Sequence, residues 1–97
     1  MATRGGAKAI GMGSRLGSIQ PGFLADLILI DTRVPHMTPM HDPIATLVYS
    51  AQGPDVQTVI VDGQVVMRNR EILTRDERQI LAQARERAMN ARRRAGL

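Results

Sequence analysis

The sequence predicts an α+β fold in which one β-strand and one β-hairpin are flanked by helices. Two β-branched runs joined by Asp62-Gly63 predict the hairpin. Helix-like spacing of apolar residues in segments 43–51 and 74–97 predicts two of the helices. A chain of 97 residues has the size of one small domain, and we expect a single, incomplete one.

Residues 2–12 predict a short opening helix, weakened by the glycine pair at positions 5 and 6. After a turn at Pro21-Gly22, residues 25–30 form an apolar run of strand length that only Asp26 interrupts. We therefore expect a strand over 25–30 that begins at the edge of the core, at Asp26, and continues into it.

Three prolines make segment 31–43 an irregular loop. Asp42 is placed to cap a helix over 43–51, with Pro43 at its first position. The hairpin should pair residues 56–61 with 64–68, because Asp-Gly suits a type I′ turn. The last helix, 74–97, is amphipathic and basic, and it should open with a capping box formed by Thr74 and Glu77.

The composition predicts a thin aliphatic core. Hydrophobic residues make up 43% of the chain, but Phe23 and Tyr49 are its only aromatics. Three strands with so few large apolar residues need a further layer to cover them, so the chain looks like part of something larger. The absence of cysteine excludes a disulfide scaffold and a cysteine nucleophile. No segment has the apolar length of a membrane span, and we expect a cytoplasmic protein without a membrane partner.

The positive charge belongs to the C-terminal segment. Residues 74–97 contain seven arginines and three acidic residues, and thus supply the whole net charge of +4. The triplet at 92–94 could contact phosphates. However, stacking aromatics are absent and acids share the helix, so nucleic-acid binding is the least favoured interpretation.

Candidate sites are few. His36, His41 and Asp42 are the only cluster with the chemistry of metal ligands, but their spacing is unspecific, and we expect Asp42 to cap a helix and the histidines to bond to the loop backbone. The glycine-rich segment 11–17 departs from the dinucleotide-binding fingerprint and follows a helix, which favours a simple connection. No base is recognisable beside the hydroxyls of Ser18, Tyr49 and Ser50, so we assign no catalytic or cofactor-binding residue.

Residues 16–31, LGSIQPGFLADLILID, resemble the C-terminal region of the amidohydrolase superfamily of metal-dependent (β/α)8-barrel hydrolases. The resemblance continues through PHMTPMHDP at 35–43, LVYSA at 47–51 and VIVDGQVVM at 59–67. These segments are similar to the branch that contains methylthioadenosine/S-adenosylhomocysteine deaminases and triazine chlorohydrolases.

The resemblance implies that residues 2–12 correspond to the last barrel helix and residues 16–73 to the C-terminal share of a composite β-sandwich. It also implies a parent enzyme that binds zinc or iron and hydrolyses a C–N or C–Cl bond on a purine-like or triazine-like ring. The family's metal ligands lie upstream of this region, so the barrel and its catalytic residues have no counterpart in the chain. We therefore expect a structural module that is inactive alone and pairs with the missing barrel portion. The alternative is an independent module that forms a homo-oligomer through its open sheet edge.

Overall fold

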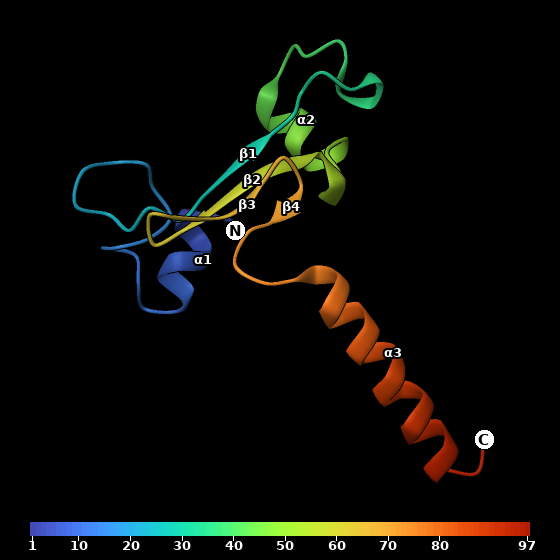
Figure 1. Cartoon of the computed structure of the whole chain (residues 1–97). Helices are drawn as coiled ribbons and strands as arrows, with labels where there is room; N and C mark the ends of the chain where they lie inside the picture. The colour runs from blue at the N-terminus through green and yellow to red at the C-terminus, as the bar shows by residue number, and fades with distance from the viewer.

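The computed structural model describes residues 1–97 and shows a small sheet with short helices around it and one long helix that extends away from it (Figure 1). The chain measures 52 × 36 × 24 Å along its principal axes. The elements in order are α1 (Arg4–Ala9), β1 (Leu27–Ile30), η1 (Pro35–Met37), α2 (Pro43–Tyr49), η2 (Gly53–Asp55), β2 (Val56–Val61), β3 (Gln64–Arg68), β4 (Glu71–Ile72) and α3 (Glu77–Arg94).

Helix α1 is shorter than the expected helix over 2–12. It spans only Arg4–Ala9, and no side chain caps its N-terminus at Thr3. Two glycines in its first turn lower its helix propensity, and Gly11 then takes a φ of 74°, which ends the helical path. Its one buried residue is Ala7, whose carbonyl accepts a hydrogen bond from the Met12 N–H in the loop that follows, at 2.8 Å.

The sheet is antiparallel with the order β1-β2-β3-β4. The predicted hairpin is confirmed, because β2 and β3 pair across Asp62 and Gly63, whose φ angles of 49° and 76° fit a type I′ turn. Strand β1 begins at Leu27 and not at residue 25. The reason is that the Asp26 carboxylate accepts a hydrogen bond from the Asp62 N–H at 2.8 Å, so this residue is used to hold the hairpin turn.

A second tight turn adds a fourth strand that the sequence did not predict. Asn69 and Arg70 have φ angles of 49° and 64°, so the chain reverses there without a glycine. Strand β4 then pairs with β3 over Glu71–Ile72. The sheet therefore has short strands at both edges, β1 and β4.

Helix α2 begins as predicted. The Asp42 carboxylate accepts hydrogen bonds from the N–H groups of Ile44 and Ala45, at 2.9 and 3.2 Å, and Pro43 occupies the first turn. The helix ends at Tyr49, two residues earlier than expected. The preceding loop is irregular apart from the single turn η1, which carries Met37 into the core.

Helix α3 begins at Glu77, and the predicted capping box is wrong. Asp76 is the N-cap, and its carboxylate accepts a hydrogen bond from the Gln79 N–H at 3.0 Å. Asp76 is itself a strong N-cap residue, so the helix starts later than residue 74. Every residue of α3 is exposed, and Figure 1 shows the helix projecting away from the sheet.

The chain has almost no interior. Four residues are buried: Ala7, Met37, Asp55 and Thr58. Large apolar side chains such as Ile28 and Ile44 remain 56% and 74% exposed. The mixed α and β class and the thin core are confirmed, and the chain contains no barrel.

Candidate functional site

The most extensive surface feature is a hollowed apolar face between α1, β1, α2 and β2. Twenty-three residues line it, and 16 of them are hydrophobic. We call this surface the open face; the side chains that matter most below are Ile10, Ile28, Ile44, Leu47, Val48 and Ile60.

The chemistry of the open face is that of a contact surface. Asp26 is its only charged side chain, and the carboxylate of Asp26 is already bonded to the hairpin turn. The face therefore offers no group for acid–base chemistry. Large contiguous apolar patches of this kind are typical of surfaces that contact another protein element, a membrane or a ligand.

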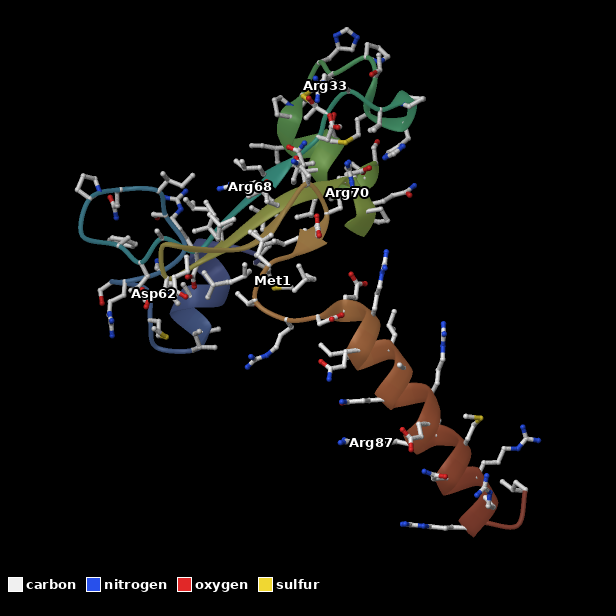
Figure 2. The ribbon with its side chains drawn as sticks, viewed as in Figure 1. Met1, Arg33, Asp62, Arg68, Arg70 and Arg87 are labelled. Atoms are coloured by element: carbon white, nitrogen blue, oxygen red, sulfur yellow. The ribbon has the colours of Figure 1, made fainter.

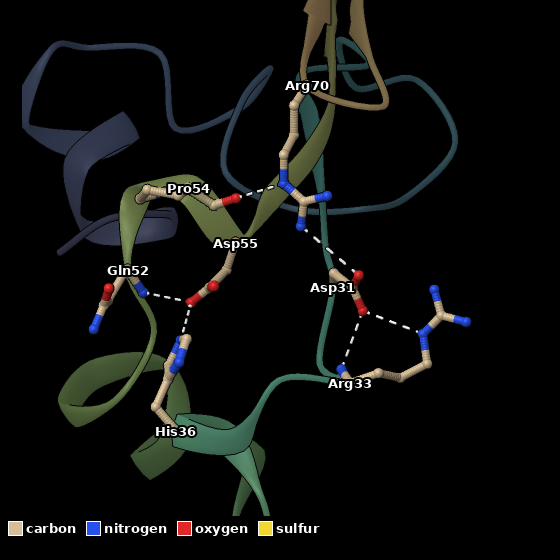
Figure 3. A network of polar contacts seen from close by, with 7 residues as sticks. All are labelled: Asp31, Arg33, His36, Gln52, Pro54, Asp55 and Arg70. Carbon is tan, nitrogen blue, oxygen red and sulfur yellow. Dashed lines mark hydrogen bonds and ion pairs between the residues drawn. The ribbon is translucent and has the colours of Figure 1, made fainter.

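A polar network lies where the end of β1 meets the start of β2, between the loops that carry η1 and η2 (Figure 3). At its centre is Asp55, which is 5% exposed. One carboxylate oxygen of Asp55, Oδ2, lies 2.7 Å from the His36 Nε2 and accepts a hydrogen bond from the Gln52 N–H at 2.7 Å. These hydrogen bonds, from His36 first and then from Gln52, lower the pKa of Asp55. The network thus ties η1 to η2.

A second carboxylate, Asp31, extends this network at the end of β1. Its Oδ1 accepts hydrogen bonds from the backbone N–H of Arg33 at 3.1 Å and from the Arg33 Nε at 3.2 Å, and these bonds lower its pKa. Arg70 lies on the other side, with its Nη2 3.7 Å from the Asp31 Oδ2. The Arg70 Nε donates a hydrogen bond to the Pro54 carbonyl at 2.7 Å. Arg70 therefore links the turn at Asn69-Arg70 to the segments that contain Asp31 and Pro54.

The structure does not bring His36, His41 and Asp42 together as a ligand set. His36 bonds to the Asp55 carboxylate and not to the loop backbone as expected. Asp42 caps α2 through Oδ1, and no hydrogen bond involves the His41 ring. No three histidine, aspartate or glutamate side chains gather closely enough to hold a metal ion. These residues therefore do not fit the zinc or iron that the resemblance implies.

The other sequence candidates have structural roles or no partner. Gly17 has a φ of 89°, and a Cβ there would meet the Arg4 backbone at 2.9 Å, so the glycine-rich segment folds closely against the start of α1. Tyr49 is 86% exposed, and the hydroxyls that donate hydrogen bonds are those of Thr38 and Thr46, not those of Ser18, Tyr49 or Ser50. The arginines at 92–94 lie in the last turn of α3.

Sequence reasoning missed Asp31, Asp55 and Arg70. A local signal exists only for Asp55, because Gln52 and Asp55 form a capping box around η2. Asp31 also bonds locally to Arg33, but the contacts of Arg70 with Asp31 and with the Pro54 carbonyl join segments far apart in the chain, which no local pattern reveals. None of the helices combines the length and apolar character needed to cross a membrane.

Comparison with known proteins gives the chain a family. Residues 1–66 match the model of the amidohydrolase family. The chain is 53% identical over 88 residues to the 5-methylthioadenosine/S-adenosylhomocysteine deaminase of Syntrophomonas wolfei, and 54% identical over 89 residues to that of Pelotomaculum thermopropionicum. The aligned residues make up 91% and 92% of this chain but 20% of each relative. The chain thus spans about a fifth of the length of these relatives.

Solved structures agree with this result. An adenosine deaminase from Xanthomonas campestris, crystallised with bound zinc, matches with a TM-score of 0.89 and 35% identity over 94% of this chain and 21% of that protein. The atrazine chlorohydrolase of Arthrobacter aurescens, complexed with zinc, matches with a TM-score of 0.76 and 30% identity, over 86% of this chain and 18% of that protein. The chain therefore belongs to the amidohydrolase family and matches the C-terminal part of its deaminases and hydrolases.

Proposed function

We propose that this chain acts as the C-terminal structural module of an amidohydrolase-family aminohydrolase. The whole enzyme would hydrolyse a C–N bond on a purine-like ring, as the names of its deaminase relatives indicate. The observation that carries this proposal is the identity of 53% to a curated 5-methylthioadenosine/S-adenosylhomocysteine deaminase over 91% of the chain. The identity to the triazine-type enzyme is lower, at 30%, which ranks C–Cl hydrolysis second.

The chemistry of such an enzyme would reside outside these residues. Metal-dependent hydrolysis requires ligands that hold the ion and a group that handles the proton of the attacking water. Here the two histidines are separated, and the most buried carboxylate, that of Asp55, is bonded to His36 and to backbone. The contribution of this chain would be to complete and position the fold that carries the site.

The open face indicates how the chain would complete the fold. The sheet is covered by no second layer in this chain, and β1 has an unpaired edge. Two sheets in a sandwich pack face to face about 10 Å apart and bury apolar side chains between them. Under this proposal residues 16–73 form the C-terminal share of a composite β-sandwich, and residues 2–12 form the last barrel helix. The preceding part of the enzyme supplies the other layer and is the partner of the open face.

Fragment complementation tests this proposal. The Syntrophomonas wolfei deaminase, shortened by its C-terminal fifth, is mixed with the 97-residue chain, and zinc-dependent deamination of S-adenosylhomocysteine is measured. We expect no activity from either part alone and activity from the mixture. The matched positive control is the relative's own C-terminal fifth. If that control restores activity and this chain does not, or if this chain deaminates alone, the proposal fails.

A further inference from the structure

Helix α2 supplies part of the open face, but packing within the chain does not hold it. Ile44, Leu47 and Val48 line the open face from α2, and all three are exposed. None of the seven residues of α2 is buried. Isolated helices shorter than about 12 residues are marginal in water, so this helix is not stable by itself. The position of α2 must therefore be set by the segments that flank it.

Both flanks of α2 bind to a single carboxylate oxygen, Asp55 Oδ2 (Figure 3). His36, which precedes the helix, lies 2.7 Å from this oxygen through its Nε2. The backbone N–H of Gln52, which follows the helix, donates to it at 2.7 Å. An ionised carboxylate only accepts hydrogen bonds, so the His36 Nε2 is the donor. We call these two bonds to Asp55 Oδ2 the Asp55 clasp.

The Asp55 clasp is anchored to the sheet but is not needed to form it. Asp55 directly precedes β2, and its carbonyl accepts a hydrogen bond from the Asp31 N–H at 2.8 Å, next to the end of β1. Strands β1 and β2 pair along their length without the clasp. The His36 side chain is 35% exposed, so water competes for its bond to Asp55. The clasp thus constrains the segment that carries α2 more than it supports the sheet.

We infer that the Asp55 clasp positions α2 for docking of the open face, and that His36 is the residue that closes it. The inference rests on the proposed function, because the docking partner is the preceding part of the enzyme. With the clasp open, α2 must be ordered at the moment of binding, and only the closed fraction of molecules is competent to bind. His36 does not line the open face, so it is a positioning residue and not a contact residue.

The test measures binding of the full 97-residue chain to the shortened Syntrophomonas wolfei deaminase by stopped-flow fluorescence. His36→Ala removes the donor and should weaken binding about tenfold, the lower end of the scale for one hydrogen bond to a charged group. The loss should appear in the association rate, with the dissociation rate unchanged within about twofold, because the competent fraction falls while the bound contacts stay the same.

Two amide substitutions at the same position keep the test decisive if alanine unfolds the chain. His36→Gln places an amide N–H within reach of Asp55 Oδ2 and should restore binding to within about threefold of the parent chain. His36→Asn has the same amide on a side chain one methylene shorter, which does not reach this oxygen, and it should bind as weakly as His36→Ala. A merely apolar or steric role of His36 would not separate the two amides.

His41→Ala is the matched control. His41 lies in the same loop, is exposed and is absent from the open face, so its replacement should change the affinity less than about twofold. Hydrogen–deuterium exchange of the isolated chains gives a second readout: α2 should exchange faster in His36→Ala than in the parent chain or in His41→Ala. Helix α3 is the internal reference, because Figure 2 shows Arg87 at the other end of the molecule from Arg33 and Arg70, which border the network.

The outcomes separate this inference from the proposed function. If the parent chain binds and the Gln and Asn variants bind equally well, the inference is overturned and the proposed function stands. Weaker binding of His36→Ala that comes only from faster dissociation would also overturn the inference, because His36 would then contact the partner. No binding by the parent chain would overturn the proposed function and the inference with it.

Discussion

Replacing Ile44 and Val48 of α2 with alanine should weaken binding of the chain to the preceding part of an amidohydrolase without destabilising the chain itself. Both side chains line the open face, and they are 74% and 68% exposed. In the proposed assembly they are buried, so most of their apolar surface leaves water only when the partner binds.

The magnitude follows from these exposures. At about 0.8 kcal/mol per buried methylene, the two substitutions remove about 2.4 and about 1.6 kcal/mol of transfer free energy. Scaling by the exposed fractions of 74% and 68% leaves a total of about 3 kcal/mol for the binding step. Since each 1.4 kcal/mol is a factor of about ten, the dissociation constant should rise about 100-fold.

The free energy of unfolding of the isolated chain should change little. The portion of the two side chains already buried is worth about 1 kcal/mol. Alanine recovers about the same amount through its higher helix propensity, at roughly 0.5 kcal/mol per position. Urea denaturation of the double variant should therefore match that of the parent chain.

The assay measures fluorescence anisotropy of the labelled chain as the shortened Syntrophomonas wolfei deaminase is added. Tyr49→Ala is the matched control, because Tyr49 is 86% exposed on the same helix but does not line the open face. The affinity of the Tyr49→Ala variant for the shortened deaminase should stay within about twofold of that of the parent chain, since no buried contact is lost. An unchanged affinity of the Ile44→Ala/Val48→Ala variant would refute the assignment of the open face as the contact surface.

Three further predictions concern the isolated chain. Met37→Ala should lower the free energy of unfolding, measured in urea, by about 2–5 kcal/mol, because Met37 is the one large side chain that is fully buried. Gly63→Ala should cost about 1 kcal/mol for its positive φ alone, whereas Gly17→Ala should cost more because its Cβ also meets backbone at 2.9 Å; equal urea midpoints for the two would contradict this. Because hydrogen bonds from His36 and Gln52 lower the pKa of Asp55 in the folded chain, the stability they give should be complete above pH 3.8 and decline as the pH falls through the lower folded value. Asp55→Asn should flatten that part of the pH profile of the urea midpoint, and an unchanged profile would show that the hydrogen bonds contribute nothing.

Local patterns predicted the elements whose chemistry is local. The Asp62-Gly63 pair identified the hairpin because both residues adopt positive φ readily, and Asp42-Pro43 identified the start of α2 because cap and first turn are adjacent. The sequence did not predict the turn at Asn69-Arg70, because arginine seldom adopts a positive φ. Its conformation is stabilised by the distant Pro54 carbonyl.

The location of the open face was only partly predictable. The shortage of large apolar residues correctly indicated a thin core. The location of the open face depends on how α1 and α2 pack beside β1, which is a tertiary outcome. The role of Asp26 is also a tertiary outcome. The sequence placed this residue at the start of a strand, but its carboxylate accepts a hydrogen bond from the hairpin turn.

Hydrogen–deuterium exchange tests most directly whether the open face is completed by the preceding part of an amidohydrolase. Backbone amides of the chain are followed before and after addition of the shortened Syntrophomonas wolfei deaminase. We predict slower exchange in β1 (Leu27–Ile30) and α2 (Pro43–Tyr49), which border the open face, and unchanged exchange in α3, which lies outside it. Exchange in β1 and α2 that stays the same while the two chains form a complex would contradict the account.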